Sequence, residues 1–257
     1  MTTLETQVIP PPAAAWDVAP ANGRLRWRDW PVIAIDLPVL YEDEGLEEMG
    51  DHSRHTKTIN FLYNGLRSHL ARLFNHHVHA NLNVHYHPLD KKAYVSPDIL
   101  VIVAALPPDA ELGAYRVGED GPAPVLVIEV LSERTYQQQD LSPTGKPVIY
   151  GRMGVQEYIL VDVSGEFLPE RLLLKRLRPG QQDAHDRPVW QDEQDEDGGV
   201  TSQLGFRLII EWDDQVRVLD AATGRRYLRP TEAEAALQEA ERRAAELAAR
   251  LAALEKT

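Results

Sequence analysis

Apolar residues recur at three- and four-residue spacing across residues 53–74, which predicts an amphipathic helix. The stripe comprises Ile59, Leu62, Tyr63, Leu66, Leu70 and Leu73. Asp51 or Ser53 is expected to cap its start, because a short polar side chain can accept a hydrogen bond from the first free backbone amides. The acidic stretch before it, residues 41–51, contains two glycines and is expected to be a loop.

Strand patterns dominate the middle of the chain. Residues 94–103 and 125–131 are short, strongly apolar runs, as expected for central strands covered on both faces. Residues 82–87 alternate apolar and polar side chains, the period of a half-buried strand. Further strands are predicted at residues 31–37, 157–163, 171–177, 204–211 and 216–219. A helix is predicted at residues 146–153, where Pro147 suits the first turn.

The two ends of the chain differ from this pattern. Residues 1–30 are rich in Pro and Ala, which predicts an extended, loosely held arm. From Thr231 onward, a seam with the 3-4-3-4-3 spacing of a coiled coil consists of Leu237, Ala240, Ala244, Leu247, Leu251 and Leu254. An isolated helix of this length is marginal in water. Two alternatives therefore stay open: a helix that packs on its own domain or frays, and a helix that self-associates.

The amino-acid composition limits the classes of protein to which the chain can belong. A length of 257 residues with 43% hydrophobic residues fits one large domain, or one domain with appendages. The absence of cysteine excludes disulfides and thiolate metal sites and fits a reducing compartment. The N-terminus lacks the pattern of a signal peptide, and the apolar runs are too short to span a bilayer. We therefore expect a soluble, cytoplasmic protein.

The net charge of −13 argues against a protein that binds any polyanion irrespective of sequence, since such a protein needs a basic face. A local basic groove remains compatible with it. Three basic clusters stand out: Arg24 to Arg28, Lys91 with Lys92, and residues 171–178. Most of these side chains are expected to be solvated surface charges.

Three ionisable residues carry the candidate chemistry. Asp98 and Glu129 each lie in an apolar run, where a carboxylate must be paired, neutralised or bound to a metal. If the two strands are neighbours, the carboxylates face one point and repel each other unless a cation separates them. Mg²⁺ suits such oxygen ligands, and Lys146 could stabilise charge on a phosphate. The set favours metal-assisted phosphodiester hydrolysis. Alternatively, the two acids satisfy backbone groups or pair with arginine.

Eight of the nine histidines lie between His52 and His87. His85 and His87 would share one strand face, because side chains alternate along a strand. Imidazole suits zinc, so a transition-metal site is one interpretation of this cluster. A solvated strand face explains the same pattern, and the sequence leaves both open.

Several motifs occur in a fixed order: Ser-Pro-Asp98, then Val-Ile-Glu129-Val-Leu-Ser, then Asp140, Lys146 and Tyr150, then Gly-Val-Gln-Glu-Tyr-Ile-Leu-Val-Asp162. Over residues 37–228 this combination resembles the Uma-type restriction endonucleases, a family of the PD-(D/E)XK nuclease superfamily. The resemblance implies an α/β fold with a restriction-endonuclease-like core, in which helices flank a mixed central sheet, plus a C-terminal coiled-coil-like helix. It divides the chain into an arm (1–30), a nuclease domain (31–228) and a C-terminal helix (229–257).

The resemblance also implies roles for residues. Asp98 and Glu129 would bind the metal, Mg²⁺ or Mn²⁺, and Lys146 would be the catalytic lysine. In the superfamily this lysine follows the acid by two residues, a position that Leu131 occupies here, so Lys146 matches relatives whose lysine has moved to the following helix. Asp51, with Glu48 as the fallback, matches a third acidic metal ligand. His55, one helical turn after Asp51, would line the site.

We therefore expect a metal-dependent endodeoxyribonuclease that acts on DNA as a homo-oligomer, a dimer joined through the C-terminal helix. The alternative is a catalytically weak or inactive nuclease-fold module that binds or assembles through its coiled-coil tail. A third option is a metal-dependent hydrolase of smaller phosphoesters. A Lys146 side chain within reach of both carboxylates would favour catalysis, and one that points to solvent would favour the binding module.

Overall fold

The computed structural model describes residues 49–87, 90, 92–107, 112–133 and 135–254, with the backbone alone for residues 49–52, 138 and 252–253. Its centre is a six-stranded sheet in the order β1-β4-β6-β7-β8-β9. These strands are β1 (His76–Ala80), β4 (Ile99–Val103), β6 (Leu126–Val130), β7 (Glu157–Val161), β8 (Leu172–Gln182) and β9 (Pro188–Glu193). The β6–β7 pair is parallel and the other pairs of this sheet are antiparallel, so the central sheet is mixed, as expected.

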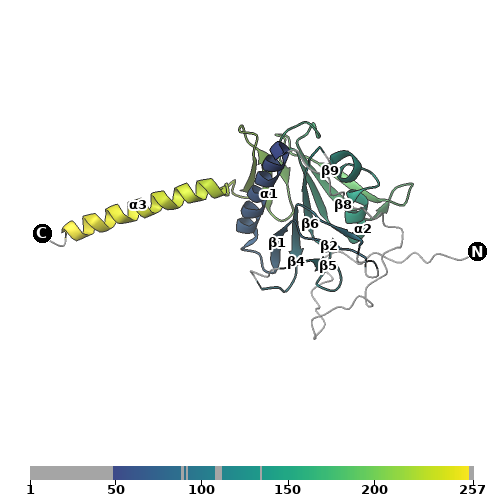
Figure 1. The fold of residues 1–257 in the computed structure, drawn as a ribbon, viewed down its shortest axis with the longest axis horizontal. Coiled ribbons are helices and arrows are strands. Elements are labelled where there is room, and N and C mark those ends of the chain that lie inside the picture. Colours follow the sequence, from purple (N-terminus) through teal and green to yellow (C-terminus); the bar gives the residue numbers. More distant parts are fainter. Residues whose placement is uncertain (1–48, 88–89, 91, 108–111, 134, 255–257) are drawn as a thin grey trace, which may run out of the picture.

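Two small sheets and the helices complete the described structure (Figure 1). One sheet has the order β3-β2-β5, formed by β2 (Val84–His85), β3 (Tyr94–Val95) and β5 (Tyr115–Arg116). The other contains β10 (Val200–Thr201), β11 (Phe206–Ile210) and β12 (Val216–Asp220). The helices are α1 (Met49–Leu70), the π-helix η3 (Tyr136–Asp140), α2 (Lys146–Met153) and α3 (Pro230–Leu254).

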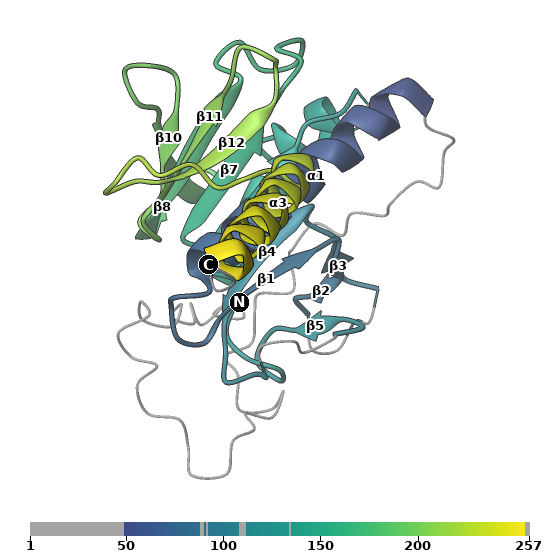
Figure 2. The ribbon, with the colours of Figure 1, turned by 90° about the vertical axis from the view of Figure 1, so that its left-hand side faces the viewer.

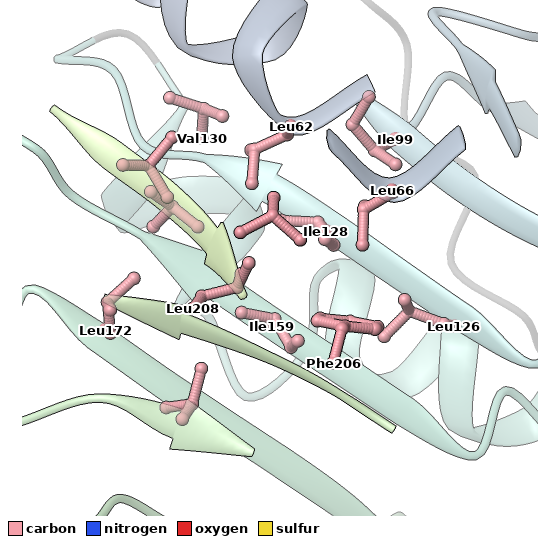
Figure 3. Packing of buried hydrophobic residues seen from close by; sticks show 14 of the residues in the cluster. Leu62, Leu66, Ile99, Leu126, Ile128, Val130, Ile159, Leu172, Phe206 and Leu208 are labelled. Atoms are coloured by element: carbon pink, nitrogen blue, oxygen red, sulfur yellow. The ribbon is translucent and has the colours of Figure 1, made fainter. Parts of the chain in front are cut away.

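Alternating side chains of the central strands fill two separate cores, because neighbouring residues of a strand point to opposite faces. On one face, Ile128 and Ile159 pack against α1 and the β10–β12 sheet, as Figure 3 shows around Leu62, Leu66 and Phe206. On the other face, Val127 and Leu160 pack against α2 and the β2–β3–β5 sheet. The strands β6 and β7 are fully buried along their length, which explains their continuous apolar sequence.

Several predicted boundaries are wrong. Helix α1 already begins at Met49, so neither Asp51 nor Ser53 caps it, and residues 49–51 are helical rather than loop. The run at residues 94–103 is two strands, β3 and β4, because Pro97 cannot donate to a ladder. The predicted strand at residues 82–87 reduces to β2, although its alternation of buried and more exposed side chains is present.

One helix was predicted correctly, while several strands were missed. Helix α2 has the predicted bounds, with proline in its first turn. Strands β1, β5, β9 and β10 were not predicted. The predicted arm at residues 1–30 and strand at residues 31–37 lie outside the described residues. Within the described residues, no helix is long and apolar enough to cross a membrane.

Helix α3 leaves the body of the molecule and projects outward, as Figure 1 shows in profile and Figure 2 nearly end-on. Its apolar residues Leu237, Leu247, Leu251 and Leu254 are all exposed. The alternative of a tail helix packed on its own domain is therefore wrong. The helix itself, starting at Pro230, agrees with the sequence prediction.

Candidate active site

Asp98 and Glu129 lie side by side on neighbouring antiparallel strands. Ile99 at the start of β4 pairs with Ile128 of β6, which brings Asp98 next to Glu129. The Asp98 carboxylate accepts a 2.7 Å hydrogen bond from the amide of Val130, and the Asp98 amide lies 3.4 Å from Glu129 Oε2. Both acids are buried. The two carboxylates therefore converge, as predicted for neighbouring strands.

Lys146 reaches into this pair from the first residue of α2. Its Nζ lies 3.1 Å from Glu129 Oε1 and 3.0 Å from Asp140 Oδ1, and its side chain is only 9% exposed. The preceding residue is Gly145, where a Cβ atom would clash with the carbonyl oxygen of Gln139. The close turn into α2 thus requires glycine. Lys146 points to the carboxylates and away from solvent.

Asp140, the last residue of η3, is the second partner of the lysine. Thr135 donates a 2.6 Å hydrogen bond to Asp140 Oδ2, and the Tyr158 hydroxyl donates to the Asp140 carbonyl oxygen at 3.1 Å. Asp140 is 1% exposed. A π-helix is uncommon, and such turns are frequent at functional sites. Here the turn carries Asp140 to the lysine.

Tyr150 completes the contacts of Glu129. It lies four residues after Lys146, on the same face of α2. Its hydroxyl donates a 2.5 Å hydrogen bond to Glu129 Oε1, so this oxygen contacts both Lys146 and Tyr150. Among the described residues, only the distant amide of Asp98 donates a hydrogen bond to Oε2. Oε2 is therefore the less engaged oxygen of this carboxylate.

Burial and charge shift the ionisation of this cluster. Burial raises the pKa of Glu129 to about 8; Lys146 opposes the shift, while Asp98 and Asp140 add to it. Burial alone would lower the pKa of Lys146, but the nearby carboxylates of Glu129, Asp140 and Asp98 outweigh it and raise that pKa. One ammonium group thus faces three carboxyl groups. The excess of acid favours either a bound proton or a further cation.

The remaining predicted residues lie on α1. His55 Nε2 is 3.2 Å from Asp98 Oδ1, so the structure brings His55 to the predicted cluster. Asp51 belongs to the first turn of α1, and its side chain lies outside the described part of the structure, as does Glu48. Asp98, Glu129, Lys146 and His55 are therefore together, whereas the contacts of Asp51 are not described.

The sequence interpretation assigned no role to Asp140 or Tyr150, although both belong to the motif order. The sequence contains a signal for Tyr150 but none for Asp140. Tyr150 follows Lys146 by four residues, which places both on one helical face. Asp140 lies in a polar stretch of the sequence, and its pairing with Lys146 depends on the π-helix and the tight turn at Gly145, which spacing alone does not reveal.

The histidines form no metal cluster in the described part of the chain, which contains no group of three or more potential metal ligands.

The third basic cluster of the sequence, residues 171–178, also has a structural explanation. Arg171 pairs with Asp214, Lys175 with Asp192, and Arg176 with Glu157 and Glu193. These side chains balance local acids.

Comparison with known proteins identifies the family. Residues 36–209 match the model of the family Uma2, described as "Putative restriction endonuclease". One similar solved structure, 19% identical in sequence, is the crystal structure of a protein from Anabaena variabilis described as "a putative nuclease belonging to DUF820". The match covers 55% of this chain and 69% of that one, with a TM-score of 0.36. No curated protein matches the chain.

Proposed function

This chain belongs to the Uma2 family, and we propose that it hydrolyses DNA phosphodiester bonds with the help of Mg²⁺ or Mn²⁺. The proposed nuclease domain spans residues 31–228. The observation that carries the proposal is the contact of the buried Lys146 ammonium with Glu129, beside Asp98. A buried lysine beside two convergent acids matches the needs of phosphoryl chemistry better than those of a purely structural ion pair.

The residues present fit a hard divalent cation. Asp98 and Glu129 offer carboxylate oxygens, which Mg²⁺ prefers, and among the described residues Glu129 Oε2 has one long contact, with the Asp98 amide. The burial that raises the pKa of Glu129 also makes an added positive charge favourable, because it would keep the carboxylate ionised. Asp98 and Glu129 would therefore hold the ion, with Asp51 as a further ligand candidate. A bound ion would polarise a phosphoryl oxygen and lower the pKa of a coordinated water.

Side chains of the protein would supply the remaining parts of the mechanism: charge stabilisation and positioning. Lys146 keeps its proton, so its ammonium can stabilise negative charge that develops on the phosphate. Asp140 and Tyr150 hold Lys146 and Glu129 in place, which limits reorganisation during the reaction. His55 orients the Asp98 carboxylate from α1. Lys146 and His55 are thus the proposed catalytic residues beside the metal-binding acids.

The first test is cleavage of supercoiled plasmid and single-stranded DNA in Mg²⁺, Mn²⁺ or EDTA. We expect metal-dependent cutting by the wild type and a loss of at least about 10²-fold in Glu129→Gln, because the variant loses a charged ligand. Glu166→Gln is the matched control, since Glu166 is exposed, lies between β7 and β8 and is not among the residues assigned to the site. It should cut like the wild type.

Circular dichroism would show that Glu129→Gln still folds, so that lost activity reports on chemistry. Cutting that survives in Glu129→Gln would contradict the assigned role of this residue. Absence of cutting on either DNA in either metal would contradict the nuclease proposal and favour the binding or assembly module. Hydrolysis of small phosphodiesters alone would favour the third option, a hydrolase of smaller substrates.

A further inference from the structure

Helix α3 presents an apolar stripe that no described part of the chain covers. Its leucines Leu237, Leu247, Leu251 and Leu254 are 59–73% exposed, and every described side chain from Ala240 to Leu251 is exposed. The stripe keeps the coiled-coil spacing from Leu237 to Leu254, the last residue of the helix. Leucines repeated on one face are unfavourable in water unless another apolar surface covers them.

The start of α3 is firmly held. Both terminal nitrogens of Arg217, on β12, donate to the Glu232 carboxylate, at 2.6 and 2.7 Å. Glu232 also accepts a 2.8 Å hydrogen bond from the Arg229 amide, which caps the first turn. Arg229 in turn contacts Asp213 and Glu211. This anchor, formed by Arg217, Glu232, Arg229, Glu211 and Asp213, fixes the direction in which the helix leaves the body (Figure 1).

We propose that α3 pairs with the α3 helix of a second copy of this chain, as a parallel two-stranded coiled coil. In that pairing each seam residue meets its own counterpart, so Leu247 faces Leu247 and Leu251 faces Leu251. Ala240 and Ala244 bury less area than the leucines, so the dimer is concentration-dependent rather than permanent. Because the anchor holds each α3 helix to its body, pairing of the two helices also brings the two bodies together.

Charges beside the seam favour the parallel arrangement. Arg243 and Arg250 follow one edge of the seam, while Glu234 and Glu241 follow the other. In a parallel pair each residue of the basic edge faces the partner residue five positions further along, so Arg243 meets Ala248, Glu241 meets Ala236, and these contacts bring no like charges together. An antiparallel pair aligned on the same leucines would put Arg243 beside Arg250 of the partner, twice. The seam of α3 therefore fits parallel pairing with the α3 helix of a second copy of the chain.

Sedimentation of the full chain over about three decades of concentration, up to about 1 mM, tests the pairing by mass action. We expect a rising dimer fraction for the wild type and a dissociation constant raised at least about tenfold in Leu247→Glu. Ala249→Glu adds the same charge on the opposite face of the helix and should dimerise like the wild type. A wild type that stays monomeric, or a dimer unaffected by Leu247→Glu, would overturn the proposal.

Thiol cross-linking tests the direction, because the chain has no cysteine of its own. Leu251→Cys should form a covalent dimer on mild oxidation, since parallel pairing places the two introduced thiols together. Ala249→Cys, facing away, should cross-link much more slowly. An equimolar mixture of Ala240→Cys and Leu251→Cys chains provides the opposite case. Preferential linkage between the thiols of these two different variants would mean antiparallel pairing and would overturn the parallel arrangement. These readouts do not depend on nuclease activity.

Discussion

At Lys146, one ammonium group holds two buried carboxylates that would otherwise repel each other. Its Nζ contacts Glu129 and Asp140 within 3.1 Å, and all three side chains are almost excluded from water. Removing one partner of such a pair commonly costs about 3–5 kcal/mol, mostly because the other charge stays buried and unpaired. The residues proposed for catalysis are therefore also residues on which the fold depends.

A double-mutant cycle on Lys146→Met and Asp140→Asn would measure this dependence. We expect each single variant to lower the free energy of unfolding in urea, and the double variant to lose less than the sum by about 0.5–3 kcal/mol. The reason is the 3.0 Å contact between the two side chains. The exposed pair Arg250 and Glu246 is a suitable comparison and should show coupling below about 1 kcal/mol. Additive losses at Lys146 and Asp140 would contradict the pairing.

The contact between α1 and the β10–β12 sheet depends on one glycine. Gly65 lies on the buried side of α1, where a Cβ atom would come within 2.6 Å of Val218 Cγ2 on β12. The absence of a side chain lets the helix and the strand approach each other closely. Both elements contribute to the core that covers the rear of the candidate site, on the α1 face of the sheet (Figure 3).

We expect Gly65→Ala to destabilise the protein. Overpacking against Val218 costs about 1–3 kcal/mol, whereas alanine gains at most about 1 kcal/mol in helix propensity. Thermal and urea unfolding would measure the net loss. Gly113→Ala is the control, because a Cβ atom at Gly113 would meet nothing within 4 Å. A Gly65→Ala variant more stable than the wild type would show that α1 can move away from β12 at little energetic cost.

The elements that the sequence predicted well are those with an unbroken pattern. The runs around Asp98 and Glu129 are buried on both faces, so their acids stood out against an apolar background. Strand β1 reads His-His-Val-His-Ala and buries only Val78, so it carried no strand signal. The π-helix that presents Asp140 depends on tertiary packing. Consequently, Asp98, Glu129 and Lys146, with His55, were predicted to lie together, whereas no role was predicted for Asp140 and Tyr150, which hold Lys146 and Glu129 in place.

The anchor of α3 joins a projecting helix to the body of the protein. Hydrogen bonds from Arg217 hold the pKa of Glu232 at about 2, well below its ordinary value of 4.5. The folded state therefore binds fewer protons at this group than the unfolded state does between these values. The stability that Glu232 contributes is complete above about pH 5 and is lost as the pH falls toward 2.

Comparing the wild type with Glu232→Gln across pH should reveal this contribution. The difference in free energy of unfolding between the two proteins should be largest above about pH 5 and shrink toward zero near pH 2. Other carboxylates titrate in both proteins and cancel in the difference. Urea unfolding at several pH values would provide the measurement. A difference that stays constant with pH would contradict the charged hydrogen bonds of Glu232 in the folded protein.

The crossover between the parallel strands β6 and β7 has a consequence for how such proteins diversify. Glu129, Asp140, Lys146 and Tyr150 all lie on this single stretch of chain, from β6 through η3 and α2 to β7. Asp98 and His55 join them from β4 and α1. Exchange of residues 126–161 between relatives, by recombination or by design, would transfer most of the site's polar network in one piece. Such a graft would need a matching acid on the neighbouring strand and a histidine on the first helix to complete the site.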